Sequence, residues 1–240
     1  MKKITIFIIL TVSTVSFINC RQISNMQNTI TEREVIEPTG KLIEINFQDS
    51  NYLDLPLYAQ DTITKDGWTI RYFVKDDSTR YNDIYIQCSK GNLKGIFYGE
   101  ELLQFRRYFI PEFAGETNSY IYFTHGCATD CSAILVFSKD SVKFTDYQRV
   151  VEYNLEYEQI LYVMDSSYEN EEKIYELALV DLTHKKTHRI TYSNICMGFY
   201  KPACIDTVIF DKKQVTIKTT LQESFGSEKE ISQTRIIKLK

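Results

Sequence analysis

The sequence predicts an all-β protein, an antiparallel meander of short hairpins with at most one or two short helices. Through most of the chain the apolar residues recur at every second position or in short runs, which is typical of strands. They almost nowhere follow the three-and-four spacing of an amphipathic helix. Aromatic residues make up 13% of the chain. This content is enough to fill the core of a folded domain.

The first nineteen residues have the layout of an export signal. Lys2 and Lys3 precede a mainly apolar run over Ile4–Leu10, which continues more weakly to Ile18 and is followed by Cys20. This apolar part is too short to span a bilayer comfortably. We therefore expect residues 1–19 to be a signal peptide.

The segment Phe17-Ile18-Asn19-Cys20 resembles the lipobox of bacterial lipoproteins. Phe17 and Asn19 stand where Leu and a small residue are commonest, and this looser pattern is similar to that of uncharacterised cell-envelope lipoproteins of the Bacteroidota. The resemblance covers twenty residues and implies that Cys20 is acylated, with no enzymatic meaning. It implies attachment to a membrane, the outer membrane first of all, with the domain in the periplasm or at the cell surface. The alternatives are an ordinary signal with a soluble product and a retained N-terminal anchor.

The chain after Cys20 divides into a polar segment and one domain. Residues 20–40 are predicted to be the lipidated cysteine and a flexible tether, because Arg21–Gly40 has few large apolar residues to bury. Residues 41–240 are predicted to be a single all-β domain.

The charge of the chain argues against nucleic acid as a partner. The 28 basic residues less Lys2 and Lys3 leave 26, against 32 acidic residues, a net charge of −6. Phosphate binding needs a concentrated basic surface, and the longest basic runs here are dipeptides. These dipeptides are Arg106-Arg107, Lys185-Lys186 and Lys212-Lys213.

Strands are predicted wherever the apolar residues alternate. In Lys41–Phe47, for example, Ile43, Ile45 and Phe47 alternate with Leu42, Glu44 and Asn46. The other predicted strands are Trp68–Val74, Tyr81–Cys88, Leu93–Tyr98, Gln148–Tyr153, Gln159–Met164, Lys173–Asp181, Thr187–Tyr192, Thr207–Phe210, Gln214–Thr219 and Thr234–Leu239. The best helix candidate is Glu100–Tyr108, and long loops are predicted over Pro111–Ser119, Ser166–Glu172 and Ser193–Ala203.

The stretch Tyr120–Lys139 predicts a buried hairpin around which the domain is organised. Tyr120–Phe123 and Ala133–Phe137 are rich in the aromatic and β-branched side chains that suit strands. The intervening segment His125–Cys131 contains the glycine and aspartate that a chain reversal uses, and we expect it to be a loop.

A weak internal repeat of strand, polar turn and strand runs through the domain. It is found in Ile84–Lys94, Ile134–Lys143, Leu177–Lys186 and Val208–Val215, with the first three copies beginning about 43 to 50 residues apart. This spacing is typical of propeller blades. A meander of short hairpins in a sandwich or barrel gives the same spacing, so we keep both architectures open.

The remaining five cysteines belong to an exported and oxidising setting. Cys127 and Cys131 are four apart across a reversal, and Cys196 and Cys204 are eight apart, so two loop-closing disulfides are predicted. Cys88 shares a strand face with Ile84 and Ile86, and we expect a buried, inert thiol.

The predicted loop with His125, Cys127, Asp130 and Cys131 is the candidate functional loop. His125, Cys127 and Cys131 could act as soft metal ligands, but their spacing is not that of common zinc sites and no fourth ligand is indicated. We therefore predict no metal and no cofactor. No catalytic motif of the common hydrolases or phosphate-binding proteins is present. His184 and His188 flank a basic turn and are predicted to be exposed.

The sequence therefore favours a lipid-anchored envelope protein that binds a protein or glycan ligand, and binding is favoured over catalysis. One alternative is an immunity-type or inhibitor lipoprotein that neutralises an exported toxin. Another is an envelope hydrolase with a site built from loops, in which nucleophilic catalysis would depend on His125.

Overall fold

The computed structural model describes residues 31–32, 41–46, 60–75, 84–98, 110–128, 131–164, 176–196, 204–224 and 226–239. Within these ranges the chain forms seventeen β-strands and no α-helix, and every strand pair is antiparallel. No described segment is therefore a helix long and apolar enough to cross a membrane. The all-β prediction is confirmed, while the candidate helix Glu100–Tyr108 lies outside the described residues.

The first two sheets have five strands each. The first sheet has the order β2-β4-β5-β6, with β3 paired to β4, and the second has the order β1-β10-β9-β8-β7. The strands of the first sheet are β2 (Leu42–Glu44), β3 (Thr62–Ile63), β4 (Thr69–Lys75), β5 (Tyr85–Lys90) and β6 (Leu93–Tyr98). Those of the second are β1 (Thr31–Glu32), β7 (Glu112–Glu116), β8 (Tyr120–Ala128), β9 (Cys131–Ser138) and β10 (Lys143–Gln148).

The last two sheets are simple meanders. The third sheet has the order β11-β12-β13-β14 and the fourth the order β15-β16-β17. The strands of the third sheet are β11 (Val150–Asn154), β12 (Gln159–Val163), β13 (Glu176–Asp181) and β14 (Lys186–Thr191). Those of the fourth are β15 (Ile205–Phe210), β16 (Gln214–Gln222) and β17 (Glu230–Lys238).

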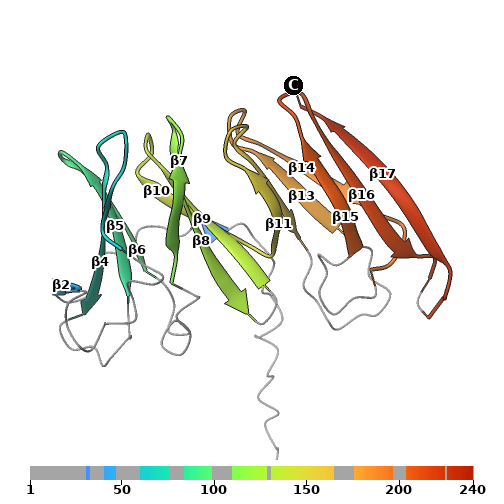
Figure 1. Ribbon diagram of the computed structural model, residues 1–240, viewed down its shortest axis with the longest axis horizontal. Coiled ribbons are helices and arrows are strands. Elements are labelled where there is room, and N and C mark those ends of the chain that lie inside the picture. The colour runs from blue at the N-terminus through green and yellow to red at the C-terminus, as the bar shows by residue number, and fades with distance from the viewer. Residues whose placement is uncertain are drawn as a thin grey trace, which may run out of the picture.

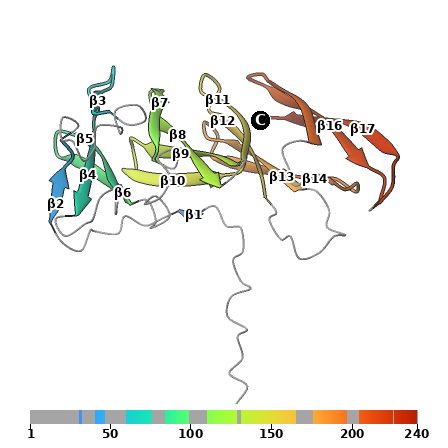
Figure 2. The same cartoon turned by 60° about the horizontal axis from the view of Figure 1, so that its bottom comes forward.

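The four sheets stand face to face in chain order, like successive blades of a propeller, in a row whose two ends are apart (Figure 1). The view in Figure 2 shows the same row, with β1 beside β10 near its middle. Of the architectures left open, a closed barrel is not formed, because the described strands divide into four separate sheets instead of one closed sheet.

Three apolar cores fill the spaces between consecutive sheets. The first core joins the first two sheets and includes the edge-to-face contact between Trp68 and Phe137, with ring centroids 5.1 Å apart. The second core joins the second and third sheets, where Tyr147 of β10 packs against Tyr162 of β12. The third core joins the third and fourth sheets and includes Leu179.

This stacking explains which strands are uniformly apolar. In β9, Leu135 and Phe137 enter the first core while Ile134 and Val136 enter the second, so both faces of the strand are buried. Strand β16, in the middle of the last sheet of the row, alternates instead, because only the face that carries residues such as Val215 is covered by another sheet. A strand that is buried on both faces thus indicates an inner sheet of the row, and a strand that alternates indicates a sheet at one of its ends.

The internal repeat corresponds to one hairpin in each sheet. The repeated segments form β5-β6, β9-β10, β13-β14 and β15-β16. Four-residue turns follow Ser138, Asn154 and Asp181, and the last residue of each turn has positive φ: Val142 at 56°, Glu158 at 53° and Lys185 at 52°. The predicted loop Pro111–Ser119 is wrong in part, because Glu112–Glu116 pairs with β8 as the edge strand β7.

Candidate functional site

His125 lies in a strand, not in the predicted loop. β8 continues to Ala128 and β9 begins at Cys131, and His125 pairs with Ala133 across the two strands. The register shifts between Gly126 and Ala128, where a β-bulge accommodates the glycine that had suggested a turn. Asp130 lies outside the described residues. The structure therefore corrects the segment His125–Cys131 from a loop to a bulged hairpin end.

The His125 side chain bridges two strands that are not neighbours in the sheet. Its Nε2 lies 3.0 Å from Oδ1 of Asp146 on β10, and both side chains are less than a tenth exposed. Ala133 of the intervening strand β9 is paired with His125 on one side and with Gln148 on the other. We infer that the small Ala133 side chain leaves the room in which the imidazole reaches across β9.

Both ring nitrogens of His125 face oxygen atoms. Nδ1 is 2.8 Å from the carbonyl oxygen of Gly126, while Nε2 faces the Asp146 carboxylate. The Nε2 amide of Gln148 adds a long contact of 3.5 Å to the second carboxylate oxygen. Each acceptor can take a hydrogen bond from the ring nitrogen that it faces. Neither nitrogen is free to take a proton from a nucleophile in this arrangement.

A pocket of about 330 Å³ opens beside this pair. It lies where the end of the β8-β9 hairpin meets β11 of the third sheet, and its polar lining includes Glu112, Thr124, His125 and Ser132. Its apolar lining is made by Ile110, Ala133, Val150 and Tyr153. The volume is at the lower end of the range of small-molecule sites, and the mixture of apolar walls and few polar groups is typical of them.

The cysteines fall into two disulfide-bonded regions and one isolated thiol. The structure contains the predicted disulfide Cys196–Cys204. Cys131, which lines the pocket, is disulfide-bonded; the side chain of Cys127 is outside the described residues, so that pairing stays a prediction. Cys88 is a free, fully buried thiol whose pKa is raised by burial, as an inert thiol requires.

The other two histidines do not line the pocket. In the described ranges no three side chains of His, Cys, Asp or Glu are placed to hold a metal ion. His184 is at a turn, 46% exposed, with Nδ1 2.7 Å from Asp181. His188 was predicted to be exposed, but it is partly buried and its Nε2 is enclosed. Cys20 lies outside the described residues.

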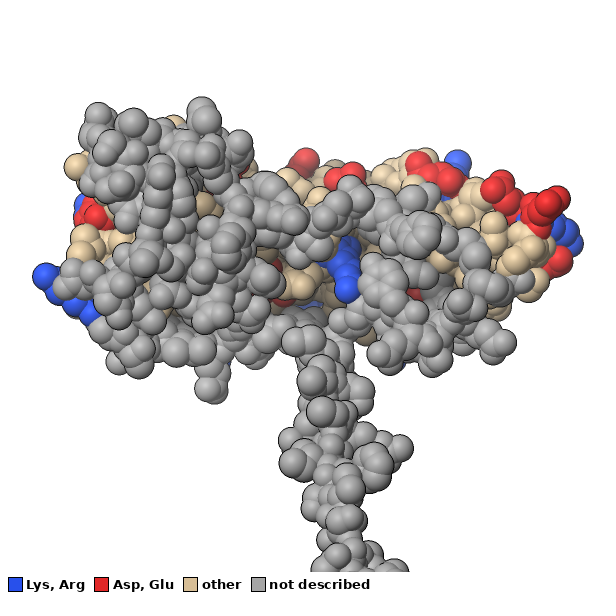
Figure 3. All heavy atoms as spheres, turned by 90° about the horizontal axis from the view of Figure 1, so that it is seen from below, with Lys and Arg blue, Asp and Glu red and all other residues tan. Residues whose placement is uncertain are grey.

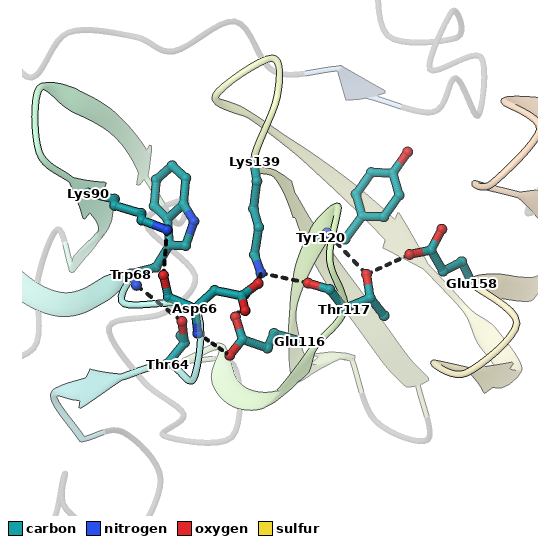
Figure 4. Close-up of polar contacts among 9 residues, drawn as sticks. All are labelled: Thr64, Asp66, Trp68, Lys90, Glu116, Thr117, Tyr120, Lys139 and Glu158. Carbon is teal, nitrogen blue, oxygen red and sulfur yellow. Dashed lines mark hydrogen bonds and ion pairs between the residues drawn. The ribbon is translucent and has the colours of Figure 1, made fainter.

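A polar network at the opposite end of the second sheet was not predicted from the sequence (Figure 4). Its centre is Lys139, 6% exposed, whose ammonium group donates to Asp66, Glu116 and the carbonyl oxygen of Thr117 at 2.5, 2.7 and 2.6 Å. The N–H of Asp66 also donates to Glu116. The network therefore connects the β3-β4 turn of the first sheet to the turns of the second.

The contacts continue toward the third and fourth sheets. The Thr117 hydroxyl donates to Glu158 in the β11-β12 turn, at 2.5 Å, and the Tyr120 hydroxyl donates to the Leu182 carbonyl oxygen, at 3.1 Å. Gln159 donates to the carbonyl oxygen of Asp211 in the fourth sheet. Polar contacts at or beside the tight turns thus join all four sheets along one side of the row.

The charges at the centre of the network shift the pKa values of Glu116, Asp66 and Lys139. Burial alone raises the pKa of Glu116, but the hydrogen bonds from Lys139 and from other donors outweigh it and lower that pKa. The hydrogen bond from Lys139 lowers the pKa of Asp66. Burial lowers the pKa of Lys139, and its two carboxylate partners outweigh this and raise it. Lys139 was overlooked because an isolated lysine after a strand is the usual sign of an exposed turn.

The described charges do not form a continuous patch on the face seen from below. Figure 3 shows the described lysine and arginine side chains separated from one another, and basic and acidic groups alternate at the end formed by the fourth sheet.

Comparison of the chain with protein-family models, with curated proteins and with solved structures finds no match in any of the three.

Proposed function

We propose that the protein is a lipid-anchored binding module of the bacterial cell envelope and that the pocket beside His125 holds its ligand. The anchor is the acylated Cys20, at the end of the export signal. The tether then places the domain in the periplasm or at the cell surface, on the outer membrane.

The observation that carries the binding role is the pocket itself. Its 330 Å³ suit a ligand of about the size of a sugar ring, and its apolar walls and hydroxyl groups suit the two kinds of surface that a sugar presents. Tyr153 adds to the lining an aromatic side chain of the kind on which sugars stack.

Binding is favoured over catalysis by the bonding of His125. A general base must be within hydrogen-bond reach of the proton that it removes. Here the two ring nitrogens of His125 face Gly126 and Asp146, so the imidazole acts as a fixed part of the wall. This arrangement supports a rigid, preorganised binding site more than the hydrolase alternative.

Two matched variants test the pocket. Ser132 lies exposed at the rim, so Ser132→Phe fills the pocket without overpacking a buried position. Ser141→Phe makes the same change in the exposed turn at the other end of the β9-β10 hairpin and is the control. We expect calorimetric titration with a panel of monosaccharides to show binding to the native chain and to Ser141→Phe. Ser132→Phe should lose this binding, and equal binding to both variants would refute the pocket.

The anchor has its own test. Cys20→Ala should abolish labelling by a fatty-acid analogue and move the protein out of the membrane fraction, because the acceptor thiol is gone. Equal labelling of the variant and the native protein would exclude acylation at this position.

A further inference from the structure

The charges around the pocket are unbalanced. His125 and Asp146 are paired with each other and together are neutral when both are ionised. Cys131 is disulfide-bonded and carries no charge. Among the described residues that line the pocket, the remaining charged side chain is Glu112, so this part of the lining carries net negative charge.

Glu112 is also available to a ligand. It is exposed at the start of β7, and its carboxylate takes part in no hydrogen bond or ion pair of the described chain. Glu116, at the other end of the same strand, shows the contrast, because its side chain is 8% exposed and bound to Lys139. One carboxylate of β7 is thus used by the fold, and the other faces solvent beside the pocket.

A cation placed in this pocket finds complementary surfaces on both sides. Glu112 offers an opposite charge, and Tyr153 adds an aromatic side chain to the lining, of the kind whose π face attracts ammonium groups. Ile110 and Val150 offer apolar surface to a carbon skeleton, while Thr124 and Ser132 bring hydroxyl groups. An anionic ligand would meet the Glu112 carboxylate, and the described lining contains no lysine or arginine to offset it, while His125 is committed to Asp146.

From this charge and lining we propose that the pocket selects an amino sugar with a free, protonated amine, and that Glu112 is the residue that selects it. This inference rests on the proposed function, because it assigns a ligand class to the same pocket. The carbon face of the sugar packs on Tyr153 and Val150. Its ammonium group lies against the Glu112 carboxylate.

Three sugars of one ring size isolate the charge. Glucosamine, glucose and glucuronate carry a positive, a neutral and a negative group on similar rings, and each is titrated calorimetrically into the full chain at pH 7. An ion pair at a partly exposed carboxylate is worth about a five-fold change in affinity. We expect glucosamine to bind about five-fold more tightly than glucose, and glucuronate to bind more weakly than either.

The variant Glu112→Gln should remove the preference, so that glucosamine binds no more tightly than glucose. Glu152→Gln is the matched control, since Glu152 is exposed on β11 next to Tyr153 in sequence but outside the pocket lining. Equal affinity for glucosamine and glucose, or a preference for glucuronate, in a chain whose sugar binding is lost in Ser132→Phe would refute the charge inference and leave the pocket standing. Sugar binding that survives Ser132→Phe would refute the pocket, and the absence of binding by any of the three sugars would refute the ligand class.

Discussion

Replacing Lys139 by methionine tests whether the polar network holds the first two sheets together. Methionine keeps most of the length of the side chain but removes the ammonium group, which leaves the Glu116 carboxylate, 8% exposed, without its cation. Removing one partner of a buried ion pair costs about 3 to 5 kcal/mol. Glu116 retains the N–H of Asp66 as a donor, so we expect the lower end, about 3 kcal/mol.

The half-exposed Asp66 adds little to this cost, because water solvates its carboxylate when the lysine is gone. For a domain of this size, 1 kcal/mol corresponds to about 2 to 4 °C in Tm, so Lys139→Met should lower Tm by about 6 to 12 °C. Urea and thermal unfolding followed by circular dichroism measure both quantities. Lys143→Met, at an exposed position of β10, is the control and should change stability by less than about 0.5 kcal/mol.

A double-mutant cycle with Glu116→Gln identifies the cause of the loss. In the Glu116→Gln background no buried carboxylate is left without a cation, so the loss of unfolding free energy caused by Lys139→Met should fall to about 1 kcal/mol. A loss of the same size in both backgrounds would show that Lys139 stabilises the fold by packing alone. A loss below about 1 kcal/mol in the native background would refute the importance of the network.

The pH dependence provides a second check. The pKa values of Glu116 and Asp66 are below their ordinary values of 4.5 and 3.8, so the stability that these groups contribute is present above those values. It is lost as the pH falls through the lower, folded-state pKa values. The difference in unfolding free energy between the native chain and Lys139→Met should therefore narrow below about pH 4. A constant difference down to pH 2 would contradict the electrostatic explanation.

Three further predictions concern packing, disulfides and the tether. Gly95→Ala places a Cβ 2.5 Å from the buried Phe137 ring, so it should destabilise the fold by about 1 to 3 kcal/mol, and an unchanged Tm would contradict the tight contact. Non-reducing peptide mapping should find Cys127 joined to Cys131; free thiols with stoichiometric zinc would instead indicate a metal site. Limited proteolysis should cut first within Arg21–Gly40, and early cuts confined to the domain would contradict the predicted boundary.

The sequence also misled in identifiable places. Gly126 predicts a turn after Tyr120–Phe123, but the strand continues through a bulge. A bulge inserts one extra residue into a strand and often contains glycine, so in the sequence it is not distinguished from a turn. The charges and Gly115 predict a loop over Pro111–Ser119, yet Glu112–Glu116 forms a strand, because an edge strand needs apolar residues on one face only.

The sequence by itself determined the fold class and the hairpins. A period of two in the apolar residues specifies strands regardless of their partners, and the repeated strand-turn-strand segments became one hairpin in each of the four sheets. It also singled out Cys88, because neighbouring residues in the chain show that it lies on an apolar face of its strand. The Cys196–Cys204 disulfide was predictable because the two cysteines are only eight positions apart.

Only the tertiary structure decided how the sheets stack and which polar groups meet. His125 and Asp146 come from β8 and β10, and Lys139 reaches Asp66 across 73 positions. Period two specifies the face of a strand on which a side chain lies, but it does not specify which sheet covers that face. The contacts of Lys139 and His125 depend on which strands and sheets lie beside one another. That arrangement is set by the packing of the three cores between the sheets.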